Sequence, residues 1–288
     1  MTKSLYHIAL SLSLLLCQAS PSLANNLTTA TIPSINSHVL SNRIAHADPQ
    51  HTAVILDIDN TLLTVKTKDG LVGGPDWFEW QSNATNQHQP TAIAHSFPQL
   101  LDFNAFVLNH LHSVRCEPNT APFIHHLIKR GFTVIAATAR APEVHQATAA
   151  ALQQAGIVLS PTSKPLQRLN GHRVSANTLF SQGILYLKGQ SKAVMVKKLF
   201  DKSGQLQRYT HIIYLDDTLN NLVDFTQHYN TTTPRTQARV DTFHYTHEQW
   251  QHRYFQQLLK HSHLVQQRDA ELVTQYRQEQ QSNQQQKQ

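Results

Sequence analysis

The sequence predicts an α/β protein in which helices cover both faces of a parallel sheet. Short, continuous apolar runs recur along the chain and alternate with segments of helical pattern about 10 to 15 residues long. Four of these runs are followed by polar residues that could bind a ligand. Because the carboxyl ends of parallel strands share one edge of the sheet, where ligands gather, the same pattern predicts a single site.

The N-terminus has the features of a secretory signal. Lys3 precedes the apolar run "LYHIALSLSLLLC", and Ser22 and Ala24 are small residues at the two positions that a signal peptidase reads. We therefore expect residues 1–24 to be cleaved and the protein to be periplasmic or secreted, with an uncut N-terminal anchor as the alternative. Residues 25–50, rich in Asn, Thr, Ser and Ala, are expected to form a loose extension.

The composition is that of a soluble globular protein, with 40% hydrophobic and 15% charged residues. Loss of residues 1–24 would leave Cys116 as the only cysteine, so the core and not a disulfide must stabilise the fold. The formal charge is +6, but the basic residues are scattered and not interleaved with aromatics. This distribution argues against nucleic acid as a specific partner and favours an anionic substrate. No stretch reaches the length of about 20 apolar residues that spans a bilayer, so we expect no membrane contact after cleavage.

The core elements are predicted in chain order from apolar runs, glycines and prolines. Gly131 and Gly156 are placed where helices end, and Pro142 where a first helical turn tolerates it. Residues 276–288 are a polar, Gln-rich tract with nothing to bury and are expected to be disordered. The expected strands are 53–57, 132–138, 184–187, 211–215 and about 238–244, and the expected helices are 99–113, 120–130, 141–156, 191–200 and 247–275.

The residues after the four apolar runs share one chemistry. The first run ends in Asp57 and Asp59, the second in Thr138, the third leads to Lys192, and the fourth ends in the pair 216–217, Asp-Asp. Carboxylates this close repel one another unless a cation lies between them, and an oxygen-rich pocket suits Mg²⁺. A hydroxyl and an ammonium on the other side would then hold a phosphoryl group.

In this order the motifs resemble those of the haloacid dehalogenase (HAD) superfamily. Its phosphatase members carry D-x-D-x-T, then a Ser or Thr after a second strand, a Lys and an acidic pair. Here "DIDNT" begins at Asp57, Thr138 lies in "VIAATAR", Lys192 in "GQSKAVMVKKLF", and Asp216 and Asp217 in "YLDDTLNN". The resemblance spans residues 51 to about 246 and implies a Rossmann-like sheet.

The resemblance also implies roles for these residues. Asp57 would be the nucleophile that forms an aspartyl phosphate, and Asp59 the acid that protonates the leaving oxygen and later activates water. The phosphate would be held by Thr138, Lys192 and Asn60. The metal would be held by Asp57, Asp59 through its backbone carbonyl, Asp216 and Asp217. An acid two positions after the nucleophile indicates hydrolysis of a phosphomonoester. One departure from the family pattern is Leu215 in place of a glycine, with Asn220 and Asn221 downstream.

Superfamily members place substrate choice in an inserted cap, and the long segment between the first two motifs predicts one here. We expect a small helical cap at residues 67–115, with the core formed by 51–66 and 116–246. Trp77, Phe78 and Trp80 follow the Gly-Gly pair of this segment and are candidate substrate contacts, although large aromatics usually pack a core. Arg140 is a further candidate contact.

The sequence admits three other interpretations. Zinc is disfavoured because the His125-His126 and His261-x-His263 pairs show no third ligand at metal spacing. A phosphorelay receiver domain has its acidic pair on the first strand, whereas here the pair comes last. A catalytically weak protein that binds an envelope or secreted partner is the alternative to an exported, Mg²⁺-dependent phosphomonoesterase with a small phosphorylated substrate.

Overall fold

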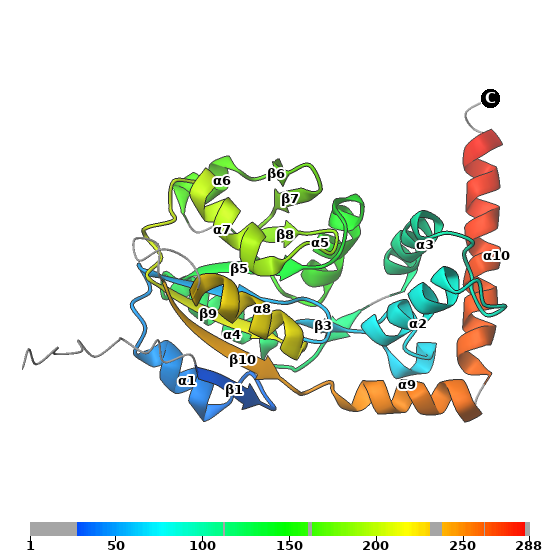
Figure 1. Ribbon diagram of the computed structural model, residues 1–288, viewed down its shortest axis with the longest axis horizontal. Coiled ribbons are helices and arrows are strands. Elements are labelled where there is room, and N and C mark those ends of the chain that lie inside the picture. The colour runs from blue at the N-terminus through cyan, green and yellow to red at the C-terminus, as the bar shows by residue number, and fades with distance from the viewer. Residues whose placement is uncertain (1–27, 112, 161–162, 231–237, 262, 286–288) are drawn as a thin grey trace, which may run out of the picture.

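A mostly parallel sheet of eight strands forms the centre of the protein (Figure 1). The computed structural model describes residues 28–111, 113–160, 163–230, 238–261 and 263–285. The sheet order is β1-β10-β9-β2-β5-β8-β7-β6; β7 pairs antiparallel with both β8 and β6, and the other pairings are parallel. The strands are β1 (Thr28–Ile32), β2 (Thr52–Leu56), β5 (Thr133–Thr138), β6 (His172–Ser175), β7 (Thr178–Ser181), β8 (Ile184–Tyr186), β9 (His211–Asp216) and β10 (Arg239–Tyr245).

Successive residues of the central strands face two separate cores. In β2, Val54 and Leu56 lie in one apolar cluster, and Ala53 and Ile55 lie in another. Both faces are buried, which explains why these strands read as continuous apolar runs and confirms the predicted fold class. The first face is covered by α1 (His38–Ala45), α4 (Thr120–Lys129) and α5 (His145–Gln154), and the second by α6 (Lys164–Arg168), α7 (Lys192–Lys202) and α8 (Leu219–Asn230).

The predicted core elements are present with small shifts at their ends. The segment 141–156, predicted as one helix, begins with a 3₁₀ turn at Pro142–Val144 and continues as α5. The two strands of the β6–β7 hairpin were not among the strands predicted from the sequence. Both strands have only four residues, and His172 and Arg173 of β6 are exposed, so the pair lacks the long apolar run that identified the other strands.

The N-terminal segment 25–50 is not a loose extension, and that prediction was wrong for the residues that the structure describes. Strand β1 pairs in parallel with β10, with Ala30 opposite Phe243. Helix α1 follows and buries Leu40 and Ile44. The segment reads as polar because β1 is rich in Thr, a residue that favours strands although its side chain is polar.

The buried carboxylate of Glu117 fixes this segment to the sheet. It accepts hydrogen bonds from Ser34 Oγ (2.6 Å), the Ile35 amide (2.7 Å) and Tyr245 Oη (2.7 Å). Burial alone would raise the pKa of Glu117, but these hydrogen bonds outweigh it and the pKa is lowered. The ionised carboxylate therefore joins the chain after β1 to the end of β10.

A second layer of helices lies beyond the carboxyl ends of the strands, at the right of Figure 1. We call α2, α3, α9 and α10 the helical unit, because they share one apolar cluster that includes Trp77, Phe103, Phe255 and Leu272. The predicted cap at 67–115 is helical, but half of the helical unit comes from the C-terminal part of the chain. The helices are α2 (Pro75–Asn86), α3 (Phe97–His110), α9 (Trp250–His261) and α10 (Leu264–Gln285), with a 3₁₀ turn at Thr67–Asp69.

The C-terminal predictions need two corrections. The single helix expected at 247–275 is two helices, α9 and α10, and residues 276–285 of the tail predicted as disordered belong to α10. Gln is a good helix former, and Tyr276 packs against Phe103 and Phe106 of α3 with ring centroids 5.5 and 5.4 Å apart. Tertiary contacts thus anchor a helix whose own sequence shows little apolar periodicity.

A two-stranded ladder joins the helical unit to the sheet. Strands β3 (Leu63–Thr64) and β4 (Val114–Arg115) pair antiparallel where the chain leaves and re-enters the core. At Gly73, φ is +83°, and an added Cβ would lie 2.9 Å from Val107 Cγ1, so this close turn requires glycine. Within the described ranges, none of the helices combines the length and apolarity needed to cross a lipid bilayer. The predicted signal, residues 1–24, lies outside the described residues.

Candidate active site

The strand ends that carry polar residues meet at one edge of the sheet. Strand β2 lies between β9 and β5, with Leu56 opposite Leu215 on one side and Ala136 on the other. The amide of Asp57 continues this pairing by donating to Leu215 O (2.9 Å). The first acid of the sequence motif and the later acidic pair are therefore neighbours, as predicted.

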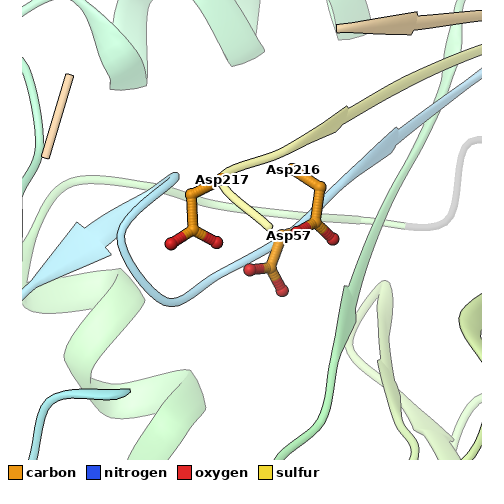
Figure 2. Close-up of side chains that lie close together, drawn as sticks. All are labelled: Asp57, Asp216 and Asp217. Carbon is orange, nitrogen blue, oxygen red and sulfur yellow. The ribbon is translucent and has the colours of Figure 1, made fainter. Parts of the chain in front are cut away.

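Three carboxylates converge at this edge (Figure 2). Each of Asp57, Asp216 and Asp217 offers an oxygen, and these oxygens all lie within 4.8 Å of one another. Asp216 is fully buried and Asp57 nearly so. We call these three residues the acid cluster.

Lys192 lies between two members of the acid cluster. Its Nζ donates to Asp57 Oδ1 (2.6 Å) and to Asp216 Oδ2 (2.5 Å). Lys192 is the first residue of α7, and Ser191 caps this helix by accepting a hydrogen bond from the Val194 amide (3.3 Å). The cap sets where the helix begins and so directs the lysine into the site, in the first turn where the sequence predicted it.

Asp216 is held by neutral donors as well. The Thr218 amide donates to its Oδ1 (2.8 Å), Asn221 Nδ2 donates to both oxygens (3.0 and 3.2 Å), and the Tyr214 hydroxyl donates to Oδ2. Asn221, one of the two asparagines that follow the acidic pair, therefore orients the carboxylate of Asp216 through its amide.

The acid cluster carries more negative charge than Lys192 balances. Burial raises the pKa of Asp57 well above its usual value; Lys192 opposes this, and Asp216 and Asp217 add to it. Burial, followed by the charge of Asp216, raises the pKa of Asp217 to about 7. Burial would lower the pKa of Lys192, but Asp216 and Asp57 outweigh it, so the pKa is raised. With all three acids ionised, the net charge is −3 + 1 = −2, and carboxylate oxygens are the donors that Mg²⁺ prefers. The residues present therefore fit a divalent cation.

Asp59 forms an ion pair with Arg140. Arg140 Nη2 donates to Asp59 Oδ1 (2.7 Å) and Arg140 Nε to Asp59 Oδ2 (3.1 Å). Arg140 Nη1 also donates to Thr148 Oγ1 (3.1 Å). Burial would lower the pKa of Arg140, but Asp59 outweighs it and raises the pKa. The side chain of Asp59 binds Arg140 and is not one of the three clustered carboxylates. The metal role expected for its backbone carbonyl is not affected by this ion pair and stays a prediction.

The other two residues predicted to hold the phosphate, Thr138 and Asn60, are buried. Thr138 is fully buried; its Oγ1 accepts from the Arg140 amide (3.1 Å) and lies 3.5 Å from Asp59 Oδ2. Asn60 has a φ of +55°, and its Oδ1 accepts from Thr64 Oγ1 (3.4 Å). Neither side chain lines the cavity described next. Asn60 shapes the turn after β2, and Thr138 supports the residues around Asp59.

A cavity of about 600 Å³ lies between this edge of the sheet and the helical unit. Phe78 lines it, whereas Trp77 and Trp80 do not. Trp77 is fully buried and its Nε1 donates to Asp269 Oδ1 (2.8 Å), and Trp80 packs against Phe255 with ring centroids 6.1 Å apart. The two tryptophans therefore pack within the helical unit, and the prediction that they contact the substrate was wrong. The polar wall contains Asp57, Asp59, Arg140, Lys192 and Asp217.

Sequence reasoning missed the opposite wall. It is one stripe of α3, formed by Phe97, Leu101, Asn104 and Leu108. The spacing of four, three and four residues places these side chains on one face of the helix. That spacing was visible, but a second stripe of apolar residues on α3 follows the same period, and the sequence does not say which stripe meets the core.

The chain belongs to the family described as "Protein of unknown function (DUF2608)", which matches residues 28–273. The family that matches is not a HAD family, so the assignment of this chain to the HAD superfamily was wrong. Short motifs of Asp, Thr and Lys at strand ends arise wherever a parallel sheet builds an anion site, so they do not identify a family. The match runs from the first residue of β1 into α10, so it includes the helical unit as well as the sheet. No curated protein and no solved structure matches the chain.

Proposed function

We propose that this protein is a Mg²⁺-dependent phosphomonoesterase that acts through an aspartyl phosphate on Asp57. One observation carries the proposal: Asp57 and Asp217 of the acid cluster, together with Lys192, line a cavity large enough for a small substrate, and Asp216 lies directly behind them. A site that can hold a divalent cation and also presents ammonium and guanidinium groups suits an anion with several oxygens. A phosphoryl group is such an anion.

The residues divide between metal and phosphate. Asp57, Asp216 and Asp217 would hold Mg²⁺, which when bound would offset the charge of the phosphoryl oxygens and of the acid cluster. Lys192 and Arg140 both line the cavity and supply positive charge on the phosphate side. Burial of Lys192 strengthens its attraction for a phosphoryl oxygen, because little water screens it.

The chemistry is a double displacement at phosphorus. A carboxylate oxygen of Asp57 attacks the phosphorus, the bond from phosphorus to the leaving oxygen breaks, and the released alkoxide takes a proton. Water then attacks the phosphorus of the aspartyl phosphate, which gives inorganic phosphate and restores the Asp57 carboxylate. Atoms and charges balance with water as the only co-reactant.

The ion pair between Asp59 and Arg140 would have to open when the substrate binds. Both oxygens of Asp59 accept hydrogen bonds from Arg140 in this structure, so the carboxyl cannot reach a leaving oxygen while the pair is closed. An incoming phosphate offers Arg140 a competing anionic partner. When Arg140 turns to the phosphate, the released Asp59 carboxylate can take up a proton from water and pass it to the leaving alkoxide; in the second step it accepts a proton back from the attacking water.

The test is hydrolysis of a panel of small phosphomonoesters by the purified protein, with Mg²⁺ and with EDTA. We expect turnover that EDTA abolishes and that Asp57→Asn lowers at least about 1000-fold, because the amide is a far poorer nucleophile. Acid quenching during turnover should yield a peptide containing Asp57 with the added mass of one phosphoryl group. Asp201→Asn, at an exposed position of α7, is the matched control and should retain wild-type rates.

Equal rates for wild type and Asp57→Asn would refute the proposal. Phosphate binding without turnover in any ester would instead favour the second candidate, a binding protein of the envelope or of the secreted fraction. The closed Asp59–Arg140 pair is the observation that favours this candidate, since it withholds the acid. Export follows from the predicted signal at 1–24 and stays a prediction.

A further inference from the structure

The wall of the cavity opposite the acid cluster is apolar and comes mainly from α3. Leu101 and Leu108 flank Asn104 on the stripe that faces the cavity. The neighbouring stripe, which includes Leu100 and Phe103, is buried in the protein. Helix α3 therefore has two apolar faces, and the fold uses only one of them for packing.

Two aromatic rings lie together on the apolar wall. Phe78 of α2 and Phe97 of α3 meet edge to face, with ring centroids 6.3 Å apart and an interplanar angle of 67°. Both line the cavity, and Phe97 is 42% exposed. A large aromatic side chain left exposed beside a second one, at the wall of a cavity, is suited to cover a flat ring of a ligand.

Asn104 is the polar exception in this wall. Its Oδ1 is buried and has no hydrogen-bond partner within the described part of the chain. A buried acceptor without a donor destabilises the folded state, and the apolar neighbours on α3 provide none. Because Asn104 lines the cavity, a rotation of its side chain would present Oδ1 to an N–H or O–H group of a ligand there.

We propose that the leaving group of the substrate is a small, ring-containing alcohol that donates a hydrogen bond to Asn104 Oδ1 while Phe78 and Phe97 cover its ring. This inference rests on the proposed phosphomonoesterase function and names the substrate class of that site. A cavity of about 600 Å³ falls within the range of small-molecule sites. It accommodates a ring alcohol and its phosphate, and excludes a folded protein or a nucleic acid duplex.

The experiment compares three esters: a phenyl phosphate with a ring hydroxyl, the analogue with methyl in its place, and glycerol 1-phosphate. We expect kcat/KM to fall at least about tenfold from the hydroxyl to the methyl ester, since the methyl leaves Asn104 unpaired. We expect a further fall to glycerol 1-phosphate, which has no ring. In Asn104→Leu, the ratio between hydroxyl and methyl esters should fall to about one.

The matched control is Asn109→Leu, which makes the same change at an exposed position of α3. It should keep the wild-type preference. Calorimetry with the free ring alcohol, resorcinol, provides a second readout that does not need turnover: wild type should bind it, and Asn104→Leu should bind it at least about tenfold more weakly.

The outcomes separate the two proposals. If all three esters turn over at similar rates, or if Asn104→Leu keeps the preference for the hydroxyl, the inference about the leaving group is overturned and the phosphatase function stands. Binding of resorcinol that depends on Asn104, with no turnover of any ester, would support the subsite and overturn the phosphatase function. Absence of both binding and turnover would overturn both.

Discussion

Two buried aspartates in different parts of the molecule have opposite surroundings. Asp269 lies in the helical unit and accepts hydrogen bonds from Trp77 Nε1 (2.8 Å) and Gln81 Nε2 (2.9 Å), both of α2. Asp57, at the sheet edge, faces one ammonium and two further carboxylates. Neutral donors suffice to hold α10 against α2 around Asp269. The crowding of like charges around Asp57 is costly to the fold and would be relieved by the divalent cation proposed above, so the comparison separates a packing contact from the candidate metal site.

Replacing the ammonium of the acid cluster should have the largest effect on stability. Lys192→Met keeps most of the side-chain volume but leaves Asp57 and Asp216 without their cation, so we expect the free energy of unfolding in EDTA to fall by about 3 to 5 kcal/mol. Mg²⁺ should restore part of this loss. Urea denaturation with and without Mg²⁺ measures both effects. Lys188→Met, at a partly exposed ion pair with Glu143, is the control and should cost at most about 1 kcal/mol.

The second prediction concerns the pH dependence that Asp269 contributes. Burial raises its pKa from 3.8 to about 7, although the hydrogen bonds from Trp77 and Gln81 oppose this. Between these values the folded chain binds more protons than the unfolded chain, so this residue lowers stability as pH rises from about 4 to 7, by up to about 4 kcal/mol. Asp269→Asn should remove that component.

Denaturation of wild type and Asp269→Asn across this pH window tests the prediction. Stability relative to wild type should increase for the variant as pH rises. A difference between the two proteins that stays constant from pH 4 to pH 7.5 would contradict it.

Mg²⁺ should stabilise the protein by an intermediate amount. At a free concentration 100 times its Kd, a ligand that binds only the folded state adds about 2.7 kcal/mol. Because the pKa of Asp217 is raised to about 7, protons compete for that carboxylate, and the gain in Tm should be larger at pH 8 than at pH 6. Asp217→Asn should weaken Mg²⁺ binding in a thermal-shift titration. An unchanged titration in that variant would remove Asp217 from the metal site.

The smallest expected effect belongs to Trp77. Trp77→Phe removes the hydrogen bond to Asp269 but keeps an aromatic ring, so stability should fall by about 1 to 2 kcal/mol. Because Trp77 does not line the cavity, KM for a ring-bearing ester should not change. Phe78→Leu, which removes a ring from the cavity wall, should raise KM. Steady-state kinetics of both variants with the same ester make this comparison, and an equal change in KM would contradict it.

The sheet half of the molecule was largely predictable. Residues such as Val54 and Ile213 belong to strands buried on both faces, so local apolar runs reveal them, and parallel strands bring their polar ends together by geometry alone. This is why Asp57, Lys192, Asp216 and Asp217 meet as expected. The pairing of Asp59 with Arg140 was not predictable, because it depends on the path of the chain after β5 and not on spacing.

The helical half was predicted poorly for a related reason. Helix α10 has only a few buried residues, among them Val265 and Leu272, in a sequence dominated by Gln and charged residues. Its position depends on contacts with α2 and α3, nearly 200 residues earlier in the chain. Strand β1 was missed likewise, because an edge strand rich in Thr is recognised by the partner β10 rather than by its own composition.

By itself, the sequence determined the α/β class, the order of the central elements and the residues that form the acid cluster. These features follow from the local spacing of apolar residues and from the polar residues that come directly after each apolar run. The tertiary structure decided which aromatic side chains line the cavity, which acid is held by Arg140, and where β1 and α10 pack. The physical reason is that these features arise from contacts between segments far apart in the sequence. Such contacts depend on which surfaces meet after folding, and they cannot be inferred from a local sequence pattern.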